Sequence, residues 1–329
     1  MSSRSISHSS AKRTSCSRSD LGAQLADTTV STNRDRHQAQ ARALVEQLEQ
    51  ANQRLEQKAG RNLPLAIGVA LLIGAVVLGS LLLSQHAFVV VLMAATGLAV
   101  AETAQALLFR SILVSPWMLG IVAGLLPGIA FLRGGWALLW AGLAALVLAA
   151  LWQIVSHSIR GQSPWVAVGW STALIVYIAM SLSTVALLIT HEGGVEWLIC
   201  ALIVVVCNDT GAYASGVLFG RHPMAPRISP KKTWEGQAGA LVSSTVAGIL
   251  SVWAIAGMPW WGGLIVGPLL MVTATVGDLL ESSLKRWLGI KDMSRWIPGH
   301  GGFMDRLDAI IPSMPMAFLL FLLFATLAA

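Results

Sequence analysis

Charged side chains are scarce in this sequence. Asp, Glu, Lys and Arg make up only 12% of the 329 residues, whereas 55% are hydrophobic and the mean hydropathy is +0.68. A soluble globular domain usually carries about 25% charged residues. The low charge therefore argues against a water-soluble fold, and we expect the lipid bilayer to be the solvent for most of the chain.

Other absences narrow the class of protein. The three cysteines, Cys16, Cys200 and Cys207, form no CxxC pair and offer no disulfide framework, so we expect Cys200 and Cys207 to be small apolar core residues. The glycine-rich Walker A loop is absent, which excludes a P-loop fold. The first 20 residues contain no apolar run that fits a secretory signal, so we expect no cleaved signal peptide.

Much of the charge that is present gathers near the amino terminus. Residues 1–61 hold 10 of the 22 Lys and Arg and 6 of the 16 Asp and Glu, and nine of the first 20 residues are Ser. A Ser-rich, acid-poor start is also typical of an organellar transit peptide, but no amphipathic period accompanies it. We therefore expect residues 1–61 to form a polar cytosolic tail that begins disordered, and residues 62–329 to form a polytopic membrane domain.

An apolar stripe crosses the second half of this tail. It consists of Ala41, Leu44, Leu48, Ala51 and Leu55, whose alternating spacings of three and four form an a/d pattern of two heptads. So short a stripe fits an amphipathic helix that lies on the membrane surface or packs on the membrane domain. It also leaves open a homodimer in which two copies of the stripe associate.

Apolar runs long enough to cross a bilayer begin at residue 63. About 20 helical residues are needed to cross roughly 30 Å of hydrocarbon. The runs predict an all-α membrane protein with about nine transmembrane helices, at about 64–84, 87–109, 114–132, 135–155, 165–190, 195–218, 238–257, 261–284 and 309–328.

The placement of basic residues supports this topology. If the tail is cytosolic, nine spans put 21 of the 22 Lys and Arg on the cytosolic side and leave only Arg133 outside, as the positive-inside rule requires. We therefore expect a cytosolic amino terminus and a carboxy terminus on the outer side. The net charge of +6 then reflects mainly topology, and we expect no nucleic-acid partner.

Four carboxylates fall inside or at the ends of the predicted spans: Glu102, Asp209, Asp278 and Glu281. A charge at the bilayer centre costs about 2.5–3.5 kcal/mol on insertion scales, so such residues usually line a polar cavity. The alternative for Glu102 is a structural contact with a neighbouring helix, without a role in a functional site. For the other three it is an acid solvated at the membrane interface.

The densest polar pattern starts within the 261–284 span. Asp278, Glu281, Ser282 and Lys285 are spaced i, i+3, i+4, i+7 and therefore share one helical face. The chain then adds the bases Arg286, Lys291, Arg295 and Arg306, the acids Asp292, Asp305 and Asp308, and a glycine-rich turn around His300. Mg²⁺ typically takes one or two carboxylates plus phosphate oxygens, while Lys, Arg and exposed backbone N–H groups hold phosphate. The pattern thus predicts a site for a divalent cation and a polyphosphate.

A second basic segment lies between Gly220 and Gly236. It contains four basic residues, Arg221, Arg227, Lys231 and Lys232, and it follows Asp209 and Tyr213, which are four apart on one face of a predicted span. We expect it to bind substrate. The positive-inside rule alone is the other explanation for these cations.

Read in order, these residues resemble the signature of a known enzyme family. The run comprises Ser282, Leu284, Lys285, Arg286, Lys291, Asp292, Ser294, Ile297, Pro298, His300, Gly301, Gly302, Phe303, Asp305, Arg306, Leu307 and Asp308. It is similar to the signature of the phosphatidate cytidylyltransferase (CDP-diacylglycerol synthase) family. The segments Ser229–Gly236 and Asp209–Tyr213 also resemble family segments, and the resemblance covers roughly residues 64–329.

The resemblance implies an enzyme of phospholipid biosynthesis. Such an enzyme joins CTP to phosphatidic acid, releases pyrophosphate and leaves CDP-diacylglycerol in the bilayer. The resemblance also implies Mg²⁺ as cofactor, with a second cation, monovalent or divalent, as a further expectation. The expected location is a bacterial cytoplasmic (inner) membrane.

The resemblance further implies roles for individual residues. Catalysis falls to Asp278, Asp305, Asp308, Lys285 and Arg286, and metal binding to Asp278, Glu281, Asp305 and Asp308. Substrate binding falls to Ser229, Lys231, Lys232, Asp209, Tyr213, Ser282, Lys291, His300, Gly301, Gly302 and Arg306. For His300, ordering the turn is an equal alternative.

Three rival functions deserve comparison. An ion-coupled transporter would place its acids near the midplane and show inverted repeats, whereas the charges here crowd the predicted cytosolic side and no repeat is found. A CDP-alcohol phosphatidyltransferase would end its motif with two acids four apart, whereas Asp305 and Asp308 are three apart. A cytidylyltransferase that acts on another lipid phosphate, with an ether or polyprenyl tail, stays open because the signature concerns the phosphate chemistry.

Overall fold

A computed structural model describes residues 63–159, 161–294, 296 and 301–328, and residues Leu65–Ala329 form one compact unit. The predicted tail with its Ala41–Leu55 stripe lies outside the described residues, and so does His300. The account below concerns the compact unit.

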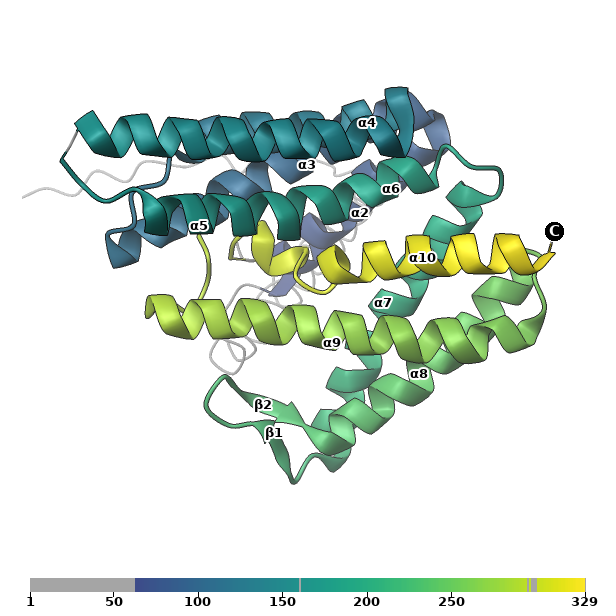
Figure 1. Ribbon diagram of the computed structural model, residues 1–329. Helices are drawn as coiled ribbons and strands as arrows, with labels where there is room; N and C mark the ends of the chain where they lie inside the picture. Colours follow the sequence, from purple (N-terminus) through teal and green to yellow (C-terminus); the bar gives the residue numbers. More distant parts are fainter. Residues whose placement is uncertain (1–62, 160, 295, 297–300, 329) are drawn as a thin grey trace, which may run out of the picture. The chain divides into compact units, whose positions relative to one another are not determined.

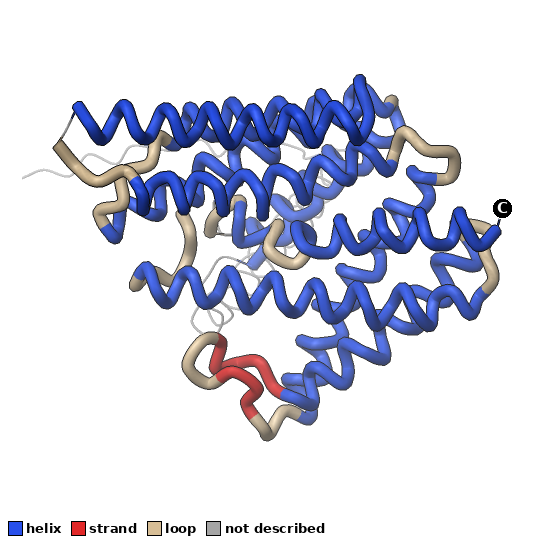
Figure 2. The backbone as a smooth tube through the Cα atoms, viewed as in Figure 1, coloured by secondary structure: helices blue, strands red, loops and turns tan. Residues whose placement is uncertain are grey.

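Helices make up almost all of the described chain (Figures 1 and 2). They are α2 Leu63–Leu83, α3 Gln85–Ala106, α4 Pro116–Ile159, α5 Trp165–Leu174, α6 Ser181–Leu188, α7 Gly194–Phe219, α8 Trp234–Ala254, α9 Gly263–Leu288 and α10 Ile310–Ala328. A π-helical turn, Ile175–Met180, joins α5 to α6, and short 3₁₀ turns occupy Leu107–Arg110, Trp260–Gly262 and Met304–Arg306. The prediction of a predominantly helical protein is confirmed.

Seven helices of the described chain are long and apolar enough to cross a membrane. They span Gln85–Arg110, Pro116–Ile159, Trp165–Leu188, Gly194–Phe219, Trp234–Ala254, Trp260–Leu288 and Ile310–Leu327. The protein is therefore an integral membrane protein, but the predicted count of nine spans is not confirmed. Two of the predicted spans fall within α4, which consists of two helices that meet at a kink at Gly134, where φ is 80° and ψ is −173°. In α2 the apolar stretch is the shorter Leu71–Leu83.

The outward faces of these helices are apolar. Large exposed side chains include Trp136, Trp140, Leu148, Val242 and Trp253. A soluble protein seldom exposes so much contiguous apolar surface, because each such group would be hydrated at a cost. In hydrocarbon the same surface carries no such cost, so the exposure agrees with a membrane-embedded bundle.

One element contradicts the all-α prediction. The strands β1 Pro223–Ala225 and β2 Ser229–Thr233 pair antiparallel, with Pro223 opposite Thr233 and Ala225 opposite Ser229. The hairpin ends where Thr233 caps α8, its Oγ1 accepting the Gly236 N–H at 3.1 Å. Strands of three and five residues leave too short an alternation to recognise in a sequence.

Close packing of helices positions the polar residues. In this bundle α7 packs on α8, α8 on α9, and α9 on α10 (Figure 1). Gly277 on α9 is essential to the last contact, because a Cβ there would overlap the Asp308 carbonyl and the Pro312 ring. Small residues let helices approach in this way inside membranes. Asp308 is thereby held against the α9 residues that carry the predicted site.

Candidate active site

Lys285 lies at the centre of a buried charge cluster near the carboxyl end of α9. Its Nζ donates to Glu281 Oε2 at 2.9 Å and to Asp305 Oδ1 at 2.8 Å. The side chains are 16%, 1% and 7% exposed, respectively. Charges buried this deeply persist only when they are paired and hydrogen-bonded. We call Glu281, Lys285 and Asp305 the lysine cluster; it joins two elements that the sequence placed in one predicted site.

Asp305 is also anchored by backbone groups of the connection between α9 and α10. Its Oδ2 accepts the Gly302 N–H at 2.7 Å and the Met293 N–H at 3.2 Å. Gly301 makes the turn with φ +80°, a conformation that favours glycine. Burial opposes ionisation of Asp305, but the Glu281 carboxyl, Lys285 and the Gly302 N–H outweigh it and hold the pKa of Asp305 below its usual range.

Asp308 lies beside the lysine cluster at the start of α10. Its Oδ1 accepts the N–H of Ala309 at 2.8 Å. Burial, and then the nearby negative charge of Asp278, raise the pKa of Asp308 to about 6. Within the described chain, Glu281 Oε1 is buried without a hydrogen-bond partner. This corner therefore concentrates more negative charge than Lys285 neutralises.

A second polar group surrounds a cavity of about 250 Å³ under the hairpin. Its lining includes Asn208, Asp209, Tyr213, Lys231, Lys232, Gln237, Thr275 and Asp278. Lys232 of β2 forms an ion pair with Asp278 of α9, and the Asn208 amide donates to Asp209 at 2.9 Å. We call this the hairpin cavity. Asp278 precedes Glu281 by one helical turn, so the hairpin cavity and the lysine cluster adjoin along α9.

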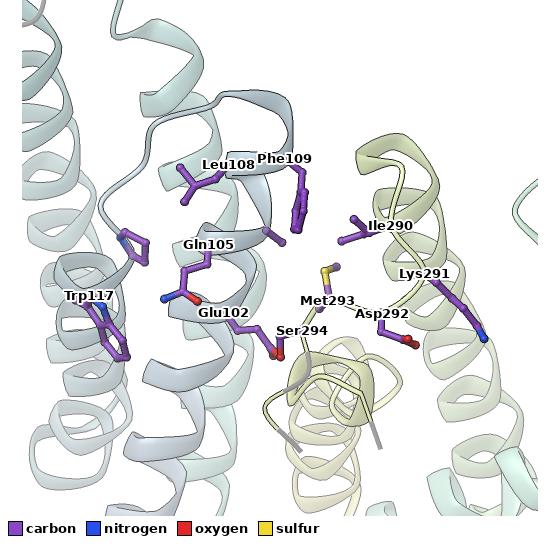
Figure 3. Close-up of a pocket in the computed structure, with 12 residues that line it drawn as sticks. Glu102, Gln105, Leu108, Phe109, Trp117, Ile290, Lys291, Asp292, Met293 and Ser294 are labelled. Atoms are coloured by element: carbon purple, nitrogen blue, oxygen red, sulfur yellow. The ribbon is translucent and has the colours of Figure 1, made fainter. Parts of the chain in front are cut away.

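Several predicted site residues take other positions. Arg286 is exposed and donates from Nε to the Ile228 carbonyl at 3.1 Å, so it holds the hairpin to α9. Lys291 lines a different pocket, of about 910 Å³, and points outward there (Figure 3). Ser229 and Ser282 are half-buried, and Arg306 is exposed. These positions do not place the five side chains in the lysine cluster.

Sequence reasoning missed three uncharged polar residues at the site and the contacts of a fourth polar residue, which it had named only as an intramembrane acid. Asn208, Gln237 and Thr275 line the hairpin cavity, with Gln237 Nε2 donating to Thr275 Oγ1 at 2.8 Å. The fourth is Glu102 of α3, whose carboxylate lies beside Ser294 of the α9–α10 connection (Figure 3). The only sequence signal for Glu102 was an acid in an apolar span, and uncharged polar residues in spans gave none.

Sequence comparison identifies the family of this chain. A family model described as "Cytidylyltransferase family" matches residues 65–324. This chain belongs to that family. The cytidylyltransferase is 38% identical over 285 residues to a phosphatidate cytidylyltransferase of Mycobacterium leprae, covering 79% of this chain and 88% of the relative. It is 37% identical over 284 residues to one of Mycobacterium bovis, covering 80% and 89%. A Brucella suis enzyme of the same name is 35% identical over 158 residues, covering 48% and 58%.

The carboxylates of this cytidylyltransferase can be compared with the needs of a metal ion. Among residues 63–159, 161–294, 296 and 301–328, no three His, Cys, Asp or Glu side chains are placed to hold one ion. Mg²⁺, however, commonly takes only one or two carboxylates and completes its shell with phosphate oxygens and water. The unpartnered Glu281 Oε1 and the surplus negative charge around Asp308 fit that kind of site. The donor set thus fits a metal that arrives with a phosphate substrate.

Proposed function

We propose that this protein transfers the cytidylyl group of CTP to phosphatidic acid, giving CDP-diacylglycerol and pyrophosphate for phospholipid biosynthesis. The observation that carries the proposal is the lysine cluster beside the hairpin cavity, built from the family signature on α9 and the α9–α10 connection. The names of the Mycobacterium and Brucella relatives support the same reaction.

The arrangement suits a reaction between two polyanions. An oxygen of the lipid phosphate attacks the α-phosphorus of CTP, the bond from that phosphorus to the bridging oxygen breaks, and pyrophosphate leaves with the electron pair. Catalysis is then mainly positioning and charge neutralisation. The lipid phosphate is already ionised, so no general base is required. This agrees with the sequence, which offers no obvious candidate for a general base.

Each group has a proposed task. Lys231 and Lys232 bind CTP phosphates at the hairpin cavity, with Asp209 and Tyr213 lining the same space. Lys285 neutralises charge that develops on the phosphates during transfer, and Asp305 orients Lys285 through their 2.8 Å contact. Arg286 stays a predicted catalytic residue. The predicted substrate contacts are Ser229, Ser282, Lys291, Gly301, Gly302 and Arg306, together with His300, which lies outside the described chain.

Magnesium is part of the proposal. Asp278 and Asp305, supported by Asp308 and Glu281, would hold Mg²⁺ together with phosphate oxygens, and a second cation stays an expectation. When bound, the metal would supply positive charge to the triphosphate. Without it, the carboxylates that flank the hairpin cavity would repel CTP, so we expect activity to require a divalent cation.

We also propose how the chain lies in its membrane. The proposed setting is a bacterial cytoplasmic membrane with nine spans, a cytosolic amino terminus and an outer carboxy terminus. The positive-inside sorting supports it, since it leaves only Arg133 outside. The homodimer stays a prediction.

A radiochemical assay tests the reaction. Purified protein is incubated with labelled CTP and phosphatidic acid, with Mg²⁺ or EDTA, and the lipid phase is analysed for CDP-lipid. We expect label in lipid only with phosphatidic acid and Mg²⁺, and at least a hundredfold loss in D305N, because Asp305 orients Lys285. The matched control is E192Q, which alters an exposed acid between α6 and α7. Equal rates in D305N and wild type would refute the assignment, and label gained from a polyprenyl phosphate instead of phosphatidic acid would change the substrate.

A further inference from the structure

Glu102 of α3 is buried, and its carboxylate accepts hydrogen bonds from the α9–α10 connection, about 200 positions further along the chain. Its side chain is fully enclosed, with 0% of the residue exposed. Oε1 accepts the Phe303 N–H at 3.0 Å, Oε2 accepts the Met304 N–H at 2.6 Å, and Oε1 also accepts the Ser294 hydroxyl. These three donors come from two ends of the same connection. No donor from α3 itself or from a neighbouring transmembrane helix shares the carboxylate among the described contacts.

The connection is held from both sides at this point. Glu102 binds the backbone N–H groups of Phe303 and Met304, while Asp305 binds the N–H of the preceding Gly302 at 2.7 Å. Gly302 itself lies between the two carboxylates: a Cβ there would come within 2.5 Å of Glu102 Oε1 and 3.0 Å of Asp305 Oδ2. Any larger residue at 302 would push the two apart.

A second contact ties α3 to the same region. Arg110, in the 3₁₀ turn that ends α3, donates from Nε to the Trp287 carbonyl at 2.8 Å, and its guanidinium lies 5.1 Å from the centre of the Trp287 ring. Two parts of the predicted site therefore contact α3 and the turn that ends it. They are the last turn of α9 and the turn before Asp305. Figure 3 shows Glu102 and Ser294 pointing toward each other across this junction.

We propose that Glu102 is a positioning residue of the cytidylyltransferase site: it fixes the backbone of Phe303 and Met304 so that Asp305 reaches Lys285. A fully buried carboxylate is costly in a membrane protein and is retained where its hydrogen bonds have a task. Asp305 directly follows the two residues that Glu102 holds, and its Oδ1 lies 2.8 Å from Lys285 Nζ. The inference rests on the proposed function, since it assigns Glu102 to that same site.

The variant E102Q tests this role. Glutamine has the same shape, but its amide group replaces one acceptor with a donor, so it cannot accept from both backbone N–H groups and from Ser294. We expect kcat for CDP-lipid formation to fall about 10- to 100-fold, because displacements near 1 Å in a reacting site have effects of that size. The KM for CTP should stay within about threefold, since the hairpin cavity is untouched.

A matched control separates positioning from burial. Thr96 is equally buried on α3, but its Oγ1 donates only to the Leu92 carbonyl of its own helix at 2.8 Å. We expect T96V to keep the wild-type kcat when rates are normalised to folded protein. Amide hydrogen exchange gives a readout besides activity: E102Q should accelerate exchange at Phe303 and Met304, and T96V should not.

The outcomes are decisive in both directions. A folded E102Q protein with kcat within threefold of wild type, or with unchanged exchange at Phe303 and Met304, overturns the proposal. If E102Q does not fold, S294A decides by the same readouts, with a smaller loss of kcat expected because it removes one of three donors. If the wild type itself makes no CDP-lipid, the proposed function fails, while the exchange measurement still tests whether Glu102 holds the connection.

Discussion

At the scale of single residues, the site is defined by one cation shared between two buried acids. Lys285 is the only partner that lies within hydrogen-bond distance of both Glu281 and Asp305 in the described structure. Removal of one member of a buried ion pair leaves an uncompensated charge and typically costs 3–5 kcal/mol. Lys285 should therefore matter for stability as well as for rate.

The variant K285M makes this concrete. We expect it to lose CDP-lipid synthesis to below one hundredth of wild type and to melt at a lower temperature in detergent, because the buried Asp305 carboxylate then loses its cationic partner. R133M, which removes an exposed cation, serves as control and should keep both properties. An active K285M protein of normal Tm would show that the cluster has neither role.

We expect the ionised side chain of Asp308 to lower the stability of the folded protein while it contributes to the proposed site. A carboxyl whose pKa is raised to about 6 in the folded protein binds its proton more tightly there than in the unfolded chain. Its contribution to the free energy of unfolding is therefore lost as pH rises from about 4 to 6, and at pH 7 the ionised Asp308 destabilises the fold.

D308N removes that charge and can keep the hydrogen bond from the Ala309 N–H. With EDTA present, we predict a Tm above that of wild type at pH 7.5 and a difference that shrinks toward pH 5, together with reduced CDP-lipid synthesis. Thermal unfolding of both proteins across this pH range is the measurement. A Tm difference that grows toward pH 5 would show that the ionised Asp308 carboxylate does not destabilise the fold.

At the scale of elements, we propose that the short hairpin binds the nucleotide. It carries Lys231 and Lys232 over the cavity and is held to α8 by Glu235. Glu235 Oε1 lies 2.5 Å from His222 Nδ1, and Oε2 accepts the N–H groups of Arg221 and His222 at 3.1 and 3.2 Å. The first turn of α8 thus fixes the start of the hairpin.

Loosening this anchor should weaken CTP binding more than chemistry. We predict that E235A raises the KM for CTP about three- to tenfold while kcat changes less than twofold, because Lys285 and Asp305 lie on other elements. Steady-state kinetics, with the exposed E196Q as control, measures the split. A fall in kcat with unchanged KM would show that the hairpin does not bind the nucleotide.

The elements also show what a sequence can and cannot predict. The polar face of α9 was predictable because helical periodicity placed Asp278, Glu281 and Lys285 together. The hairpin was not, because its strands are too short for a pattern. The contacts of Glu102 were not, because its partners are about 200 residues away and nothing in the local sequence indicates them. Long-range contacts of this kind depend on how helices pack.

At the scale of the whole molecule, the hydropathy pattern predicted a polytopic helical membrane protein and located most helix ends within a few residues. It also predicted that residues 116–159 form two helices, because two apolar runs meet at Gly134 and Gly135, and the chain does kink between two helices at Gly134.

The proposed topology has a direct consequence. A reporter that is active only outside the cytoplasm should be active when fused after Ala329 and inactive when fused after Gly161, which follows α4 in the predicted cytosolic loop. The distribution of Lys and Arg is the physical reason. The opposite pair of activities would reverse the orientation and place the lysine cluster on the wrong side for cytosolic CTP.

The central claim is that the cytidylyl group, and not another part of CTP, moves to the lipid. The most direct measurement uses CTP labelled on either the α- or the γ-phosphate, with phosphatidic acid and Mg²⁺. The account predicts that the α label enters the lipid phase as CDP-diacylglycerol, while the γ label stays in water as pyrophosphate. Appearance of the γ label in lipid, or of neither label, would contradict it.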